Sequence, residues 1–148
     1  MSSRYHHTQP GWVILGSTVP PALITLAVGT VPEIPTWPTG LILLVAAALF
    51  ASLTVDVADG AIVARFGPGL IRRRVALRDV REARVVTNRW WYGWGLRLIR
   101  GGTLYNVSGF HAVELALTDG RVWRVGTDEP EALLAAVRAQ AGLAATAA

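Results

Sequence analysis

The sequence of 148 residues contains no cysteine and no lysine, and long stretches of it carry almost no charge. Without cysteine the chain cannot form a disulfide, use a thiolate nucleophile or bind zinc through sulfur. All fourteen basic residues are arginine. Genomic codon bias is the simplest explanation for the missing lysine, although the planar guanidinium of arginine is also the better partner for phosphate.

Recognisable catalytic motifs are missing as well. The sequence has no glycine-rich phosphate loop, no nucleophile-elbow motif and no cluster of carboxylates. Two of the three histidines, His6 and His7, precede the first apolar run, and His111 has no obvious partner nearby in sequence. We therefore predict a protein that is not an enzyme and has no cofactor and no metal. Burial of His111 beside Glu114 or Asp119 in a cleft would favour an enzyme instead.

Charge is distributed unevenly along the chain. Apolar residues make up 52% of the sequence and charged residues 16%, whereas soluble domains typically carry about 25% charged residues. Between Pro10 and Val55 the only ionisable side chain is that of Glu33. The N-terminal third therefore differs from the remainder of the chain in that it is apolar and nearly uncharged.

Two uncharged runs predict a transmembrane helical hairpin over residues 11–55. Each run, at about 1.5 Å per residue, is long enough to cross a bilayer core of roughly 30 Å as a helix. The predicted spans are residues 12–31 and 38–55. A signal peptide for the first run, or two helices buried in a soluble core, are the alternatives. Pro20 and Pro21 fall in the middle of the first span, where they predict a kinked or re-entrant helix.

The positions of the arginines predict an orientation for this hairpin. Arg4 precedes the first run, thirteen arginines follow the second, and the connection between the runs has none. By the positive-inside rule both termini then face the cytoplasm. The sequence therefore predicts a multi-pass protein of the bacterial inner membrane.

Turn signals predict a β domain over residues 52–141. The pairs Asp59-Gly60, Gly101-Gly102 and Asp119-Gly120 each separate two short apolar segments, as in β-hairpins. About seven strands are predicted, the later ones at residues 71–77, 80–87, 96–100, 103–107, 111–118 and 121–126.

A helix is predicted at residues 128–140, with Asp128 as its N-cap and Glu131 completing a capping box. Its apolar face would cover an open end of the sheet. Residues 1–10 are predicted to be a flexible head and residues 142–148 a disordered tail.

The β region resembles the PH-like domain of a group of small bacterial membrane proteins. The residues that carry the resemblance are 92–97 (YGWGLR), 104–109 (LYNVSG), 112–115 (AVEL) and 126–130 (GTDEP). The resemblance implies two transmembrane helices, then a strongly bent antiparallel sheet of about seven strands capped by a C-terminal helix. It implies no reaction and no ligand site.

Arginines and aromatic residues gather between residues 65 and 100. Ten arginines in this window face only two acidic residues, Asp79 and Glu82. Strand alternation in residues 71–75 would send Arg72 and Arg74 to one face and Arg73 to the other. This surface is either an ordinary solvated face or a contact for anionic lipid head groups.

The run Arg89-Trp90-Trp91-Tyr92 has three possible uses: contact with a membrane surface, packing into a core, or stacking on nucleic-acid bases. Membrane contact is preferred and nucleic acid is the least favoured. In an extended segment Trp90 and Trp91 would point to opposite faces, and Trp94 is expected to point inward. The candidate contact residues are Arg72, Arg73, Arg74, Arg89, Trp90, Trp91 and Arg97.

These observations predict a non-catalytic, membrane-anchored module that binds a partner protein, itself or anionic lipid. The alternative is a structural subunit whose hairpin packs against other helices of a membrane complex, because Gly11, Gly16 and Ser17 permit close helix approach.

Overall fold

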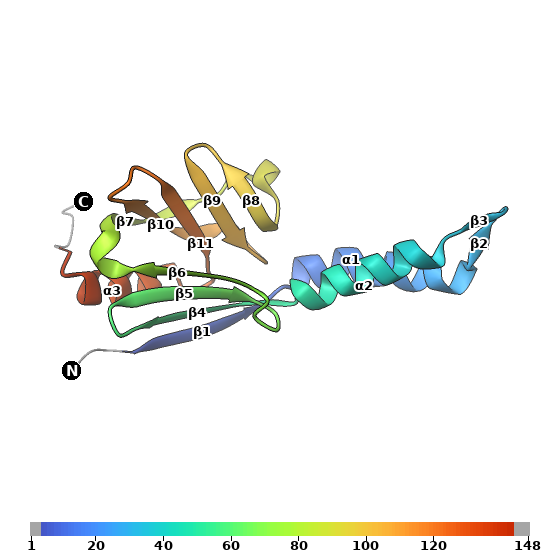
Figure 1. Ribbon diagram of the computed structural model, residues 1–148, viewed down its shortest axis with the longest axis horizontal. Helices are drawn as coiled ribbons and strands as arrows, with labels where there is room; N and C mark the ends of the chain where they lie inside the picture. The colour runs from blue at the N-terminus through green and yellow to red at the C-terminus, as the bar shows by residue number, and fades with distance from the viewer. Residues whose placement is uncertain (1–3, 144–148) are drawn as a thin grey trace.

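Two helices project as an arm from a β domain in the computed structural model, which describes residues 4–143 (Figure 1). The arm consists of α1 (Trp12–Val28), the two-stranded turn β2 (Thr30–Val31) and β3 (Ile34–Pro35), and α2 (Trp37–Leu49). Its two helices run antiparallel and pack along each other. Pro10 pairs with Ser52 immediately outside the arm, so the arm is an insertion between two neighbouring strands.

The β domain contains two separate sheets. The first sheet has the order β1-β4-β5-β6 and is antiparallel throughout. The second sheet has the order β7-β10-β11-β9-β8, with β9 and β11 parallel. The strands are β1 (Tyr5–Pro10), β4 (Ser52–Ala58), β5 (Ala61–Phe66), β6 (Ile71–Ala76), β7 (Val80–Thr87), β8 (Gly95–Ile99), β9 (Gly102–Asn106), β10 (His111–Leu117) and β11 (Val122–Gly126).

The core lies between the two sheets and is closed by the last helix, α3 (Pro130–Ala141). Alternating residues of each strand point into it, as the period of two along a strand requires. Trp123 is its largest fully buried side chain. The α3 residues Leu133 and Val137 complete the core, as the helical spacing predicted.

The predicted fold class, a transmembrane hairpin followed by a PH-like domain with about seven antiparallel strands, is wrong. The described strands after the arm number eight, β4 to β11, and they divide between two sheets. β1 adds a strand from the N-terminal segment, and the β9–β11 pair is parallel. The predicted turns at Asp59-Gly60 and Asp119-Gly120 do connect neighbouring antiparallel strands.

The predicted membrane hairpin is also wrong. Within residues 4–143, no helix combines the length and the apolar character that a bilayer crossing requires. α1 has 17 residues and α2 has 13. The predicted helical spans were too long, because residues 30–31 belong to β2 and residues 52–55 belong to β4. Three further predictions depended on this hairpin and are wrong with it: a two-span integral membrane protein, an inner-membrane location and cytoplasmic termini.

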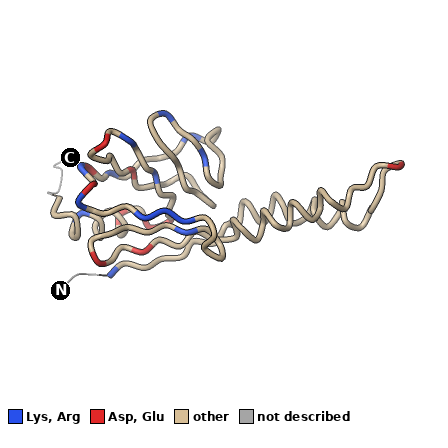
Figure 2. Tube along the Cα trace, in the orientation of Figure 1, with Lys and Arg blue, Asp and Glu red and all other residues tan. Residues whose placement is uncertain are grey.

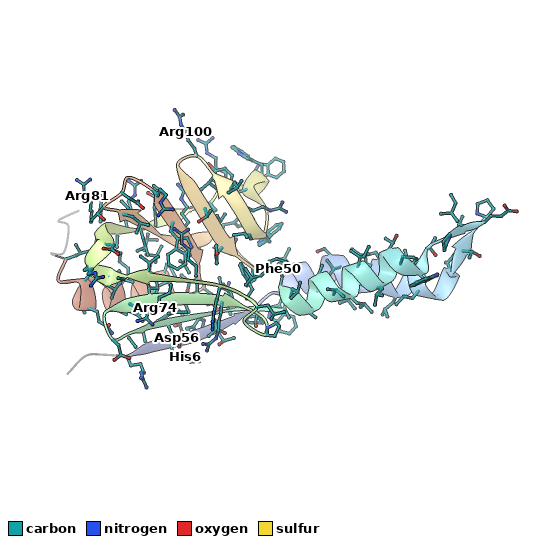
Figure 3. All side chains as sticks on the ribbon, in the orientation of Figure 1. His6, Phe50, Asp56, Arg74, Arg81 and Arg100 are labelled. Carbon is teal, nitrogen blue, oxygen red and sulfur yellow. The ribbon has the colours of Figure 1, made fainter. Side chains whose placement is uncertain are left out.

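The N-terminal segment is not a flexible head over residues 5–10, since these residues form β1. His7 Nε2 lies 2.6 Å from Asp128 Oδ1, and His6 makes a short hydrogen bond to the carboxylate of Asp56, its neighbour across the β1–β4 pair (Figure 3). Both histidines therefore fix β1 to the domain. Residues 1–3 of the predicted head lie outside the described residues.

Tyr5 adds a titratable contact to β1. Its hydroxyl donates to Glu129 Oε2 at 3.3 Å, and burial together with the nearby acidic groups raises the pKa of Tyr5 from 10.0 to about 12. A raised folded-state pKa gives stability that is complete below pH 10 and is lost as the pH approaches about 12.

We expect the phenolate absorbance of Tyr5 to appear near pH 12 in the folded protein. The Tyr5→Phe variant identifies this step in the titration curve, and the denaturant-unfolded chain provides the reference. A step near pH 10 in the folded protein would show that β1 is not docked.

The last helix begins later than predicted, at Pro130, with Glu129 as its N-cap and no side-chain cap hydrogen bond. The carboxylate of Asp128 is engaged with His7 instead of capping the helix. Gly142 ends the helix in the left-handed conformation, with φ of 66°. Of the predicted tail, residues 144–148 lie outside the described residues.

Candidate functional site

The arm is built with small residues inside and large apolar residues outside. The buried residues of its helices are Ala22, Gly40 and Ala47. A Cβ at Gly40 would lie 2.6 Å from Leu26 Cγ and 2.8 Å from the Ala22 carbonyl oxygen, so glycine is required for this close approach. This pattern is the reverse of a globular helix pair, whose large apolar side chains face each other.

Large apolar side chains are exposed on both helices and on the turn of the arm. Figure 2 shows that the arm also lacks charge except at its tip, where Glu33 stands. The exposed large apolar residues of the arm are Trp12, Leu23, Ile24, Leu26, Val28, Val31, Ile34, Trp37, Leu41, Ile42 and Val45.

Four of the hydroxyl groups of the arm, those of Ser17, Thr18, Thr25 and Thr36, do not offset this apolar character, because they bond within the arm. Thr18 Oγ1 donates to Ile14 O at 2.6 Å, and Thr25 Oγ1 lies 3.0 Å from Pro21 O and 2.9 Å from Ala22 O. Thr36 Oγ1 donates to Thr25 O at 2.8 Å and ties the start of α2 to α1. The surface of the arm is therefore apolar and has few polar groups free to bind water.

The three consecutive arginines lie on β6, the edge strand of the first sheet. Arg72 and Arg74 are exposed, and no carboxylate among residues 4–143 forms an ion pair with either. Arg73 turns inward, donates to Thr103 Oγ1 at 2.6 Å and lies 5.1 Å above the ring of Trp123. Charged residues on an edge strand discourage pairing with other chains, so this strand already has a structural reason for its arginines.

The aromatic run forms a short 3₁₀ turn, η2 (Trp90–Tyr92), rather than an extended segment. Trp90 and Trp91 are consequently both exposed, instead of pointing to opposite faces. Arg89 lies 4.9 Å above the ring of Trp91, and the ring of Tyr92 lies 5.9 Å from the guanidinium of Arg124. Tyr92 thus anchors the turn on the second sheet.

The tryptophan at the centre of the core is Trp123, not Trp94. Trp94 is half-buried, and its Nε1 donates to Gly109 O at 3.2 Å. The glycines around it explain its position, because Gly93 and Gly95 adopt φ values of 69° and 94° and bend the chain out of the turn into β8.

Glu114 is buried on the outer side of the second sheet and links three strands. Its Oε1 accepts from Arg84 Nε at 2.8 Å, and its Oε2 accepts from Arg124 Nε at 2.6 Å. Burial alone would raise the pKa of Glu114, but the hydrogen bonds from Arg124 and Arg84 outweigh burial and hold the pKa below its usual value. The carboxylate is therefore committed to an ion-pair network.

No side chains are assembled for metal binding in the part of the chain that the structure describes, where no three His, Asp or Glu residues gather around a common point. His111 is exposed at the start of β10. It is therefore not buried beside Glu114 or Asp119, which is the arrangement that would have favoured an enzyme.

A cleft of about 560 Å³ opens where the base of the arm meets β8. Side chains of α1 line one wall, Ala46 and Phe50 the second, and the segment from Gly93 to Arg97 the third. Among the described residues that line the cleft, Arg97 is the only charged one. Its Nε donates to Trp94 O at 2.9 Å, which holds the guanidinium at the rim.

The structure separates the predicted contact residues. Arg72, Arg73 and Arg74 stand on the edge of the first sheet, whereas Arg89, Trp90 and Trp91 belong to the η2 region and Arg97 to β8 at the edge of the second sheet. Arg97 alone lines the cleft. The other lining residues were not predicted from the sequence. The cleft forms only where the base of the arm lies against β8, and no local sequence motif indicates this contact.

Comparison with family models gives no match to this chain, and comparison with curated proteins gives none either. The resemblance to the bacterial PH-like membrane proteins is therefore not supported. It is also contradicted by the two-sheet arrangement and by helices too short to span a membrane.

Proposed function

We propose that this chain is a non-catalytic assembly module whose arm binds the arm of a second copy. The observation that carries the proposal is the inverted packing of the arm, with small residues between its helices and large apolar residues on its outside. A helix that is apolar all round is normally covered in the functional state. Each large apolar side chain contributes about 1.5–3 kcal/mol when fully buried.

The dimensions of the arm suit an interface between copies. A helix of 17 residues is roughly 25 Å long, and two helices side by side are about 20 Å wide. One face of the arm therefore covers about 500 Å² in projection, and its corrugated accessible area is larger. Stable interfaces bury about 800 Å² on each partner, so one face of the arm is of the required order.

A second copy fits the chemistry of the arm better than an unrelated partner. Two identical arms meet without charge repulsion, because each carries only Glu33, at its tip. Gly16 is exposed on α1, and a Cβ there would meet nothing within 4 Å, which leaves space for an approaching helix. Twofold pairing is the commonest form of self-association, and two helix pairs make a four-helix bundle.

The test compares a charge placed on the arm with the same charge placed elsewhere. We expect light-scattering mass to give twice the 15.9 kDa of one chain for the wild type. Ile42→Glu, at a side chain 67% exposed on α2, should dissociate the pair, because a buried unpaired carboxylate is costly. Leu98→Glu, at a side chain 88% exposed on β8, should leave the mass unchanged.

The absence of cysteine allows a second measurement that does not depend on weakening the interface. In Ile42→Cys the only thiol of the chain stands on the arm, and mild oxidation should yield a covalent dimer. Leu98→Cys should stay monomeric under the same conditions. A monomeric wild type would refute the proposal. It would also be refuted if the arm bound lipid vesicles or another protein instead of a second copy.

A further inference from the structure

We propose that the cleft at the base of the arm binds an anionic amphiphile, with its carboxylate on Arg97 and its alkyl chain between the arm and β8. The exposed large apolar residues of the arm, on which the proposed self-association depends, do not line this cleft. It rests on the lining of the cleft, on the charge at its rim and on its size.

The walls of the cleft are apolar. Val13 and Ile14 of α1 line it together with Phe50, Trp94 and Leu96. The two hydroxyls in the lining are already used, since Ser17 and Thr18 both donate to Ile14 O. An alkyl chain can therefore enter without leaving either of these two hydroxyl donors unpaired.

The rim carries one positive charge, that of Arg97, whose terminal guanidinium nitrogens can still donate hydrogen bonds to a ligand. Arg97 uses Nε for the carbonyl oxygen of Trp94, and no carboxylate in residues 4–143 forms an ion pair with it. A guanidinium can donate two parallel hydrogen bonds to a carboxylate. One cation at the mouth of an apolar cleft is complementary to a molecule with one anionic end and an apolar tail.

The size of the cleft is appropriate, and the wall that contains Phe50 is connected to the core. Ligand sites typically measure roughly 300–1,000 Å³, and this cleft measures about 560 Å³. The ring of Phe50 lies 5.0 Å from that of Phe66, which in turn lies 5.1 Å from that of Tyr105. The ring of Phe50 in this wall thus packs on the aromatic residues of the domain core.

Calorimetric titration of the full chain with dodecanoate, below its micelle concentration, tests the proposal. We expect about one dodecanoate per chain. Arg97→Gln should weaken binding about tenfold or more, because it removes a charged hydrogen bond. Arg100→Gln is the matched control, since Arg100 stands at the far end of β8 and does not line the cleft (Figure 3).

Dodecanol separates the charge from the alkyl chain. It should bind more weakly than dodecanoate to the wild type and equally well to the wild type and Arg97→Gln. Ala46→Leu should abolish uptake of both molecules by filling the cleft, whereas Ala27→Leu, elsewhere on the arm, should change neither. Equal uptake of dodecanoate by the wild type, Arg97→Gln and Ala46→Leu would mean that it only coats the arm, and would overturn the proposal.

Failure of this proposal can be distinguished from failure of self-association. Ile42 does not line the cleft, so Ile42→Glu should lose the dimer and keep dodecanoate binding. Arg97→Gln should keep the dimer and lose the binding.

Discussion

Replacing Trp123 with alanine is expected to cost about 3–5 kcal/mol of unfolding free energy, the range for truncating a large aromatic side chain in a core. Trp123 is fully buried. Its ring lies 5.6 Å from that of Tyr105 and 5.1 Å below the guanidinium of Arg73. The substitution therefore opens a cavity between the two sheets and also removes the surface on which Arg73 rests. Denaturant unfolding followed by circular dichroism measures the loss.

Two further variants separate the contribution of the ring from that of its polar atom. Trp123 Nε1 is buried and has no hydrogen-bond partner among the described residues. Trp123→Phe, which keeps an aromatic ring and removes this unpaired donor, should cost clearly less than Trp123→Ala. Trp90→Ala, at a side chain 73% exposed, should change the free energy by no more than about 0.5 kcal/mol. Equal losses for Trp123→Ala and Trp90→Ala would contradict the packing of the two sheets.

Replacing Glu114 with glutamine is expected to cost about 2–3 kcal/mol near neutral pH, less than the full cost of breaking a buried ion pair. Breaking a buried ion pair typically costs about 3–5 kcal/mol. The smaller figure applies here because the Arg84 side chain is 60% exposed and can be solvated, although that of Arg124 is only 20% exposed. Arg124 also supports Tyr92, so the variant should loosen the η2 turn as well.

The cost of Glu114→Gln should depend on pH. Since the folded-state pKa of Glu114 lies below 4.5, its stabilising contribution is present above pH 4.5 and disappears as the pH falls through the folded-state pKa. The free energies of wild type and variant should therefore converge in acid. Asp119→Asn, in the exposed Asp119–Arg121 pair, is the control and should leave the unfolding midpoint unchanged. A pH-independent difference would show that shape rather than charge explains the loss.

Local signals in the sequence predicted the β strands well, because turn chemistry and alternation are properties of a few neighbouring residues. Asp59-Gly60 and Asp119-Gly120 connect strands as expected, and residues 80–87 form β7 with the predicted bounds. Pairing between distant segments could not be predicted in this way. The partnership of β1 with β4 crosses the whole arm, and the parallel partnership of β9 with β11 crosses β10.

The apolar runs were interpreted incorrectly because hydropathy does not show where a helix ends. Gly29 adopts a φ of 72° and ends α1, and Phe50 ends α2 just before β4. The contrast between an uncharged arm and a charged domain was visible in the sequence. The arrangement of small residues inside the arm and large ones outside required the structure, since it depends on how α1 and α2 face each other. The cleft required it for the same reason.

The arm joins the domain through two neighbouring strands rather than through a single tether. The Gly11 amide donates to Ala51 O at 2.7 Å, and the paired strands β1 and β4 continue directly from that point. Turning the arm about its base would break this ladder of hydrogen bonds, so we expect the arm to keep its orientation relative to the first sheet. A force applied at the tip of the arm would therefore act on the first sheet. The cleft lined by Arg97 lies at the base of the arm, where the arm meets β8.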